Sequence, residues 1–238
     1  MTAAPEGSLL VARELSKAYG STRALDGAAF SIHPGEVVAV MGPSGSGKST
    51  LLHCLAGIVL PDAGTVTYRG RDLTGMTDAE RSALRRTEFG FVFQFGRLVP
   101  ELTCVENVAL PLRLAGARRK AAERAALEWM ERLEVADVAA KRPGEASGGQ
   151  GQRVAVARSL VTSPHLIFAD EPTGALDSLN GERVMELLSE AARSTGAAVV
   201  LVTHEARVAA YSDREVVVRD GRAHDPECAL AHGAGHAA

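Results

Sequence analysis

Val37-Val38-Ala39-Val40-Met41-Gly42-Pro43-Ser44-Gly45-Ser46-Gly47-Lys48-Ser49-Thr50 is the stretch of sequence that decides the fold. Its apolar first part is typical of a strand with both faces buried, and the leucines at 51, 52 and 55 predict a helix after it. The turn between them matches the phosphate-binding pattern Gly-x4-Gly-Lys-Ser, in the strand–turn–helix context that this pattern requires. Glycines let a backbone fold around phosphates, and a helix N-terminus adds N–H groups and positive potential. The stretch therefore predicts a nucleotide-binding α/β protein.

The residue types in this turn suggest individual roles. We expect Lys48 to contact the β- and γ-phosphates and Ser49 to hold Mg²⁺. Only four of the 26 basic residues are lysines, so a lysine at this position stands out. A chance glycine-rich turn is the alternative, and the flanking strand and helix disfavour it. The expected nucleotide-binding residues of the turn are Gly42, Ser44, Gly45, Gly47, Lys48, Ser49 and Thr50.

A second apolar run, Leu166-Ile167-Phe168-Ala169, delivers two acids at its C-terminal end, Asp170 and Glu171. Ligands bind at the carboxyl ends of the strands in parallel sheets. Two acidic residues after a strand more often belong to a solvated loop than to a binding site. The phosphate loop upstream makes the binding site the favoured interpretation here. We expect Asp170 to hold Mg²⁺ and Glu171 to polarise a water in line with the γ-phosphate.

Around these two strands, the chain alternates short apolar strands with helices, which predicts βαβ units and a parallel sheet. The run at 9–12 predicts a strand that leads to a loop holding Lys17 to Gly20. Residues from about 78 to 163 have helical periodicity, and this helical middle looks inserted between two parts of the sheet. The run at 215–219 with Asp220-Gly221 predicts an edge hairpin.

Composition sets limits on the class of protein. The 238 residues carry 26 basic and 29 acidic side chains, a formal net charge of −3, which argues against a nucleic-acid coat or a polybasic membrane binder. No apolar run approaches the ~18 residues needed to span a bilayer, and residues 1–8 show no export signal. Cys54, Cys104 and Cys228 are scattered, which fits a reduced cytosolic chain. We expect Cys54 and Cys104 to be small packing residues.

Ala146-Ser147-Gly148-Gly149-Gln150, with Gln152-Arg153-Val154-Ala155-Val156-Ala157-Arg158 after it, closely resembles the signature of ATP-binding-cassette (ABC) ATPases. The resemblance covers about residues 8–222, because the other motifs of that family occur in the same order. They are the phosphate loop at 42–50, Phe91-Val92-Phe93-Gln94, the acidic strand at 166–171, Gly174-Ala175-Leu176-Asp177 and Val202-Thr203-His204-Glu205. The resemblance implies a phosphate-loop ATPase core with a mostly parallel sheet, an N-terminal antiparallel β-subdomain and an α-helical subdomain inserted at about 95–162.

The resemblance also implies roles for single residues. Tyr19 occurs where the family has an aromatic ring that stacks on adenine, with a core or turn tyrosine as the alternative. Gln94 resembles the residue that contacts Mg²⁺ and the attacking water, in a loop that touches a membrane partner. His204 resembles the residue that senses the γ-phosphate, although a lone histidine after a strand is more often structural. Asp177 ends the segment that looks like the family's D-loop. Together with Glu171, Gln94 and His204 form the expected catalytic set.

Ser147, Gly148, Gly149 and Gln150 are expected to open a helix, with Ser147 as its cap. Alone, these four residues indicate a plain capping loop. In the family context, this helix start is a second anion-binding end, which serves the γ-phosphate of ATP bound to a partner copy. The resemblance thus implies a homodimer closed head-to-tail over two ATP molecules. Ala146 and Gly151 depart from the usual pattern, remove no phosphate-contacting group and are expected to loosen packing under the signature helix.

Residues from Ala223 onward are rich in alanine, glycine and histidine, and we expect a disordered tail over 223–238. A metal site built from His224, Cys228, His232 and His236 is disfavoured, because their spacing matches no compact ligand pattern.

The stretches around Gln94, at 98–112 and at 142–145 are similar to the macrolide-export and lipoprotein-release branch (MacB/LolD-like) of the family. That resemblance implies a separate transmembrane permease and a cassette on the cytoplasmic face of the membrane. Two readings stay open: a motor for efflux or lipoprotein-type mechanotransmission, and a regulatory ATPase switch that moves no cargo. A cassette working on DNA or ribosomes is disfavoured, since 238 residues leave no room for a coiled coil or second cassette.

Overall fold

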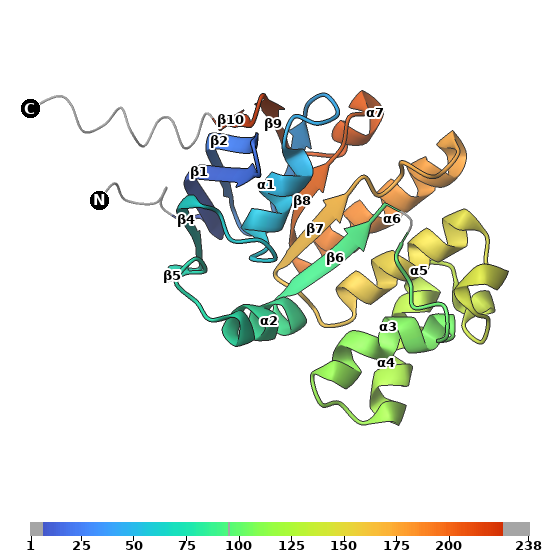
Figure 1. Ribbon diagram of the computed structural model, residues 1–238. Helices are drawn as coiled ribbons and strands as arrows, with labels where there is room; N and C mark the ends of the chain where they lie inside the picture. Colours follow the sequence, from blue (N-terminus) through green and yellow to red (C-terminus); the bar gives the residue numbers. More distant parts are fainter. Residues whose placement is uncertain (1–6, 95, 226–238) are drawn as a thin grey trace, which may run out of the picture. The chain divides into compact units, whose positions relative to one another are not determined.

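The structure of the chain is a computed structural model that describes residues 7–94 and 96–225 (Figure 1). The chain forms two compact units. The first contains the residues up to Arg81 and those from Val200 onward, and the second contains Ser82–Val199.

The first unit contains a four-stranded antiparallel sheet in the order β2-β1-β4-β5. Its strands are β1 (Leu10–Tyr19), β2 (Thr22–Ile32), β4 (Ala63–Tyr68) and β5 (Arg71–Asp72). The expected loop from Lys17 to Gly20 is wrong, because β1 continues to Tyr19, which pairs with Thr22 across a tight turn. Gly20 in the left-handed region, with φ 60°, allows this two-residue reversal.

The same unit contains the strand order β10-β9-β3-β8. These strands are β3 (Val37–Met41), β8 (Ala198–Val202, of which Val200 to Val202 belong to this unit), β9 (Arg214–Arg219) and β10 (Arg222–His224). Strand β3 runs parallel to β9, and β9 and β10 form the hairpin that the sequence predicts. The helices are α1 (Lys48–Leu55) and α7 (Ala206–Ala209).

Strand β10 corrects the expected start of the tail. Ala223 is buried and pairs with Val218, and the carboxyl group of Asp225 is buried in a hydrogen-bond network. A strand partner and a buried anchor order this segment, which composition alone had assigned to the tail. Residues 226–238, with the other candidate metal ligands of the tail, lie outside the described residues.

The second unit contains the parallel pair β6 (Phe89–Phe93) and β7 (Leu166–Asp170). Strand β6 corrects the helical periodicity expected over about 78–163, and it ends before the helical subdomain expected at about 95–162. Phenylalanine and valine favour a pleated, buried surface, and the ring of Phe91 stacks on Phe168 of β7 with 5.6 Å between centroids. This cross-strand packing overrides the helical periodicity on either side.

Helices make up most of the remaining second unit. They are α3 (Cys104–Leu114), α4 (Arg119–Arg132), α5 (Gly148–Leu160), α6 (Ser178–Thr195), and the 3-10 turns η1 (Ala136–Val138) and η2 (Pro143–Glu145), while α2 (Asp78–Thr87) crosses into this unit. The predicted apolar face at Ala126, Met130 and Leu133 is buried. Among the described residues, the structure contains no helix with the length and hydropathy to cross a membrane.

Cys54 and Cys104 are free and buried, as expected of packing residues. Burial raises the pKa of the Cys54 thiol to about 11 and also raises the pKa of the Cys104 thiol. Both side chains are therefore neutral thiols at neutral pH.

Candidate functional site

The phosphate loop connects β3 to α1 and has the shape that its glycines predict. Gly42, Gly45 and Gly47 have φ values of 149°, 77° and 107°, a region that favours glycine. A Cβ at Gly42 would overlap the carbonyl oxygen of Val218, and a Cβ at Gly47 would overlap that of Ala24. Glycine is therefore required at both positions by backbone conformation and by close approach of neighbouring strands.

The basic and hydroxyl groups of the loop lie around the start of α1. Lys48 is buried, and its Nζ donates to Gly42 O and to Pro43 O, both at 2.9 Å, so the cation lies across the mouth of the loop. Ser44 and Ser49 are exposed, and Thr50 is half-buried. Gly47, the N-cap, has no side chain to occupy the first N–H groups of the helix, which leaves an N-terminus suited to an anion.

Tyr19 and His204 belong to the same unit as the phosphate loop. Tyr19 ends β1 with 51% of its surface exposed, and Lys17 Nζ lies 5.7 Å from its ring centroid. The exposed ring rules out a core tyrosine. His204 follows β8, and because Thr203 N donates to Val40 O of β3, it lies at the strand edge where β3 leads into the phosphate loop. The roles expected of Tyr19 and His204 stay predictions.

In the second unit, Gln94 and Glu171 meet at one sheet edge. Phe93 and Asp170 are partners in the parallel β6–β7 ladder, so the next residues, Gln94 and Glu171, leave adjacent strands at the same end. A Cβ at Gly174 would lie 2.8 Å from Gln94 Nε2 and 3.3 Å from Glu171 Oε2. Glu171 has a φ of 47°, uncommon for a residue with a side chain and frequent at functional sites. The amide and the carboxylate thus converge on Gly174.

The signature residues open α5 as predicted. Ser147 Oγ accepts from Gln150 N, and Gln150 Oε1 accepts from Ser147 N, which completes a reciprocal cap. Gly148 and Gly149 lie against the following segment: their Cβ positions would be 3.5 Å from Leu176 Cδ2 and 2.6 Å from Asn180 Oδ1. The signature and the D-loop-like segment are therefore packed together.

Asp177 is the N-cap of α6. Its carboxylate accepts from Asn180 N and from Asn180 Nδ2, and these hydrogen bonds hold its pKa below the ordinary value. The Asp177 side chain is exposed and stabilises the start of α6 as its N-cap.

The sequence did not reveal that two side chains of α5 bind the backbone at the end of β6 and just after it. Gln152 Nε2 donates to Phe93 O at 3.0 Å, and Arg158 donates to Gly96 O at 2.6 Å and Arg97 O at 2.9 Å. Burial lowers the pKa of the Arg158 guanidinium. The signature helix thus holds the backbone on both sides of Gln94. The helical spacing of Gln152 and Arg158 was visible in the sequence, but their backbone partners were not.

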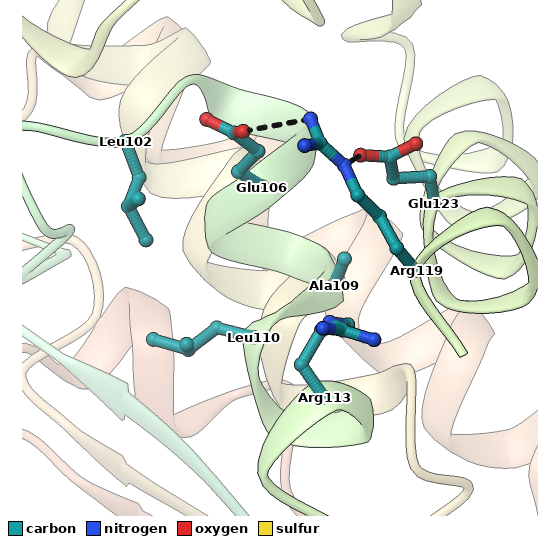
Figure 2. A pocket seen from close by; sticks show the side chains of 7 residues that line it. All are labelled: Leu102, Glu106, Ala109, Leu110, Arg113, Arg119 and Glu123. Carbon is teal, nitrogen blue, oxygen red and sulfur yellow. Dashed lines mark hydrogen bonds and ion pairs between the residues drawn. The ribbon is translucent and has the colours of Figure 1, made fainter. Parts of the chain in front are cut away.

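A hollow of about 230 Å³ lies on the helical part of the second unit, beside α3 and the start of α4. Figure 2 shows Arg119 between Glu106 and Glu123 on its polar side, with ion pairs of 3.2 and 2.6 Å. Figure 2 also shows the apolar side chains of Leu102 and Leu110 on its other side. The hollow is therefore lined by apolar side chains on one side and by charged side chains on the other.

A phosphate loop that opens a helix, together with an acidic strand end, defines the class of phosphate-loop nucleotide hydrolases. The chain belongs to the ABC transporter family, whose pattern it matches over residues 25–174. It is an ATP-binding, ATP-hydrolysing cassette of that family, and the predicted fold class and resemblance are confirmed.

Relatives cover nearly the whole chain. The lipoprotein-releasing system ATP-binding protein LolD of Geobacter metallireducens is 44% identical over 219 residues, which is 90% of this chain and 97% of the relative. LolD 2 of Caulobacter vibrioides is 42% identical over 217 residues, 90% of this chain and 95% of the relative. The dimeric, post-hydrolysis structure of the ATP-binding cassette MJ0796 bound to ADP and Pi is 38% identical with a TM-score of 0.84 and covers 91% of this chain and 97% of its own.

Proposed function

We propose that this cassette hydrolyses Mg²⁺-bound ATP with Glu171 as the group that polarises the attacking water. The observation that carries the proposal is the convergence of Gln94 Nε2 and Glu171 Oε2 on Gly174, at the joint carboxyl end of two parallel strands. A carboxylate accepts the proton of a water and an amide orients it, which is the pair of groups that γ-phosphoryl hydrolysis needs. In this proposal, His204 contacts the γ-phosphate.

The phosphate loop is proposed to hold the triphosphate. Lys48 already lies across the loop on two carbonyl oxygens, from which its ammonium group is placed to reach the phosphates. Gly42, Ser44, Gly45, Gly47 and Thr50 supply backbone or hydroxyl donors, and the exposed ring of Tyr19 stacks on the adenine.

The proposed Mg²⁺ ligands are Ser49, Gln94 and Asp170. A hydroxyl, an amide carbonyl and a carboxylate are all hard oxygen donors, so the donor set fits this cation. When bound, Mg²⁺ neutralises charge that develops on the β- and γ-phosphate oxygens.

A dimer with two shared ATP molecules is the proposed active form. Ser147 and Gly148 are exposed at the start of α5, and the buried Gly149 packs against Asn180 near Asp177. This joint surface offers the start of α5 to the γ-phosphate of a partner copy. The related cassette MJ0796 has a dimeric structure with ADP and Pi bound, which supports a dimer as the active form.

The proposed partner is a separate membrane permease of the lipoprotein-releasing type, with the cassette on the cytoplasmic face of the membrane. Support comes from the relatives of that name at 42–44% identity. The segment after Gln94 is well placed to relay contact with a partner, because the buried amide of Asn107 on α3 binds Val99 N, Val99 O and Leu102 O. Purification of the tagged full chain from its native membrane, followed by identification of the bound membrane protein, tests this assignment. Recovery without a permease argues against it.

Glu171→Gln tests the hydrolytic role. The variant should bind ATP like the wild type but lose turnover by roughly 10²-fold or more, the scale of losing one polarising group. It should also elute as an ATP-dependent dimer on a sizing column. Glu190→Gln on the exposed face of α6 removes the same charge elsewhere and should change neither property. A Glu171→Gln protein with wild-type turnover contradicts the proposal.

A further inference from the structure

The phosphate loop rests against the backbone of three neighbouring segments of the first unit, which we call the socket. Val218 O on β9 confines Gly42, and Ala24 O on β2 confines Gly47. The third segment is the Asp220–Gly221 turn between β9 and β10, where Gly221 N donates to Ser46 O at 3.0 Å. Because all three contacts involve backbone atoms, the position of the loop follows the position of these strands and not the rotamers of side chains.

The turn is itself fitted closely onto β2. Gly221 O accepts from Asp26 N at 2.9 Å. A Cβ at Gly221 would lie 2.9 Å from Ala24 O and 3.1 Å from the Cα of Leu25. Gly221 therefore touches the same carbonyl group that confines Gly47, so a side chain at this position would have to push the turn away from both β2 and the loop.

Side chains fasten β10 to β2 on both sides of this contact. At the turn, Arg222 donates to Asp26 Oδ2 through Nε at 3.1 Å and through its terminal nitrogen at 2.9 Å. At the far end, Asp225 is only 2% exposed and accepts from Ser31 N at 2.6 Å, from Ser31 Oγ at 2.8 Å and from Arg214 at 2.9 Å. The buried pair makes Asp225 the firmer of the two anchors, since an exposed ion pair contributes little.

We propose that the Asp220–Gly221 turn is a positioning element for the phosphate loop, with Gly221 as the positioning residue and Asp225 as its anchor. The inference rests on the proposed function of loop 42–50 as the triphosphate site. Consecutive N–H groups must point at the phosphates together. The N–H of Gly221 donates to Ser46 O and so fixes the peptide group between Ser46 and Gly47. Movement of the turn therefore weakens ATP binding and raises KM, while kcat at saturating ATP changes little.

The chain offers a matched control in its other tight hairpin. Arg69-Gly70, between β4 and β5, has φ values of 47° and 77°, and Asp220-Gly221 has 49° and 76°. Among the described residues, a Cβ at Gly70 meets no atom within 4 Å. Gly221→Ala and Gly70→Ala thus impose the same backbone conformation on alanine, and only the first presses on Ala24 and the phosphate loop.

The experiment measures the Kd of a non-hydrolysable ATP analogue, KM and kcat for ATP, and the melting temperature of the full-length variants. Gly221→Ala should raise Kd and KM by about tenfold, a loss of the size of one weakened binding contact, with kcat within about twofold of wild type. Gly70→Ala should leave Kd and KM within about twofold of the wild type while lowering the melting temperature. Equal analogue affinity in the two variants overturns the proposal.

Asp225→Asn keeps the shape of the anchor but removes the charge that faces Arg214. This variant tests the positioning role of the turn if Gly221→Ala does not fold. A folded Asp225→Asn protein should show raised Kd and faster hydrogen exchange at the amides of residues 42–50, and wild-type values of both overturn the proposal. Lys48→Ala separates this inference from the proposed function. If Lys48→Ala binds the analogue like the wild type, the assignment of loop 42–50 fails. If it loses binding while Gly221→Ala keeps it, only the positioning role fails.

Discussion

Gly151→Ala in the signature helix should stabilise the protein. Gly151 is the fourth residue of α5, within its hydrogen-bonded interior, and its N donates to Ser147 O at 2.8 Å. A Cβ there meets no atom of residues 7–94 and 96–225 within 4 Å, so against these residues alanine adds neither a clash nor a new contact. The gain is therefore the intrinsic difference between glycine and alanine in a helix, about 0.8–1 kcal/mol. For a chain of this size, such an increase in the free energy of unfolding corresponds to a rise in melting temperature of roughly 2–4 °C.

Gly149→Ala, two residues earlier in the same helix, is the matched comparison. Its Cβ would lie 2.6 Å from Asn180 Oδ1 and 3.2 Å from Asn180 Cβ. To make room, the Asn180 side chain must leave Asp177, to which its Nδ2 donates at 2.7 Å. Overpacking costs about 1–3 kcal/mol, which exceeds the helical gain, so this variant should melt at a lower temperature than wild type. In a double-mutant cycle, Asn180→Ala should recover part of that loss.

Circular dichroism at 222 nm during heating, at one protein concentration and without nucleotide, measures both variants. A rise for Gly151→Ala with a fall for Gly149→Ala supports the reasoning. A Gly151→Ala protein that melts below the wild type would refute it, because no described atom lies close enough to the added Cβ to account for the loss. The residue Gly151 was expected to loosen packing under the signature helix. Because a Cβ at this position meets no described atom within 4 Å, the glycine weakens the helix through its low helix propensity and not through lost packing.

Three further predictions concern single side chains. The neutral, buried thiol of Cys54, whose pKa is raised to about 11, should resist iodoacetamide at pH 8 in the native protein and react after denaturation; fast native labelling, measured by mass spectrometry, contradicts this. The Asp177 carboxylate, whose pKa is lowered by Asn180, should stabilise α6 above the unfolded pKa of about 3.9 and lose that effect as pH falls through the folded value. The difference in melting temperature between wild type and Asp177→Ala should therefore shrink on acidification, and a constant difference counts against the cap. Ser46→Ala removes a buried hydroxyl that has no hydrogen-bond partner among the described residues, so the variant should neither bind nucleotide more weakly nor melt at a lower temperature. A tenfold higher Kd, about 1.4 kcal/mol, would place that hydroxyl on a phosphate.

The parts of the site that could be predicted from sequence are those written in one continuous segment. The phosphate loop follows from Gly42 to Ser49, because glycine, lysine and the flanking strand and helix each have a local meaning. The cap at Ser147 follows in the same way, since its partner Gln150 is three residues away. In both cases the structure reproduces the predicted element, because propensity and tertiary packing favour the same conformation.

The parts that sequence could not reveal depend on partners distant in the chain. Strand β6 lies in a helix-rich region, and its state is decided by packing of Phe91 on Phe168 in β7. The anchor at Asp225 depends on Ser31, 194 residues away, so composition alone assigned its surroundings to the tail. Such contacts have no fixed spacing along the chain and appear only once strand order is known.

The same distinction explains why glycines carry so much of the long-range information in this protein. Gly70 and Gly221 are indistinguishable by local criteria, since each follows a residue with positive φ in a two-residue hairpin turn. Their surroundings differ, because Gly221 lies against Ala24 and Ser46, while no atom of the described chain lies within 4 Å of a Cβ at Gly70. The sequence of a turn therefore indicates only that glycine fits its backbone conformation. The structure is needed to show which neighbouring atoms occupy the space that a side chain would take. At Gly221 this space is occupied by β2, the strand that also confines Gly47 of the phosphate loop. Nucleotide binding is therefore expected to depend on a hairpin that is distant in the sequence, since Gly221 follows Ser46 by 175 residues (221 − 46).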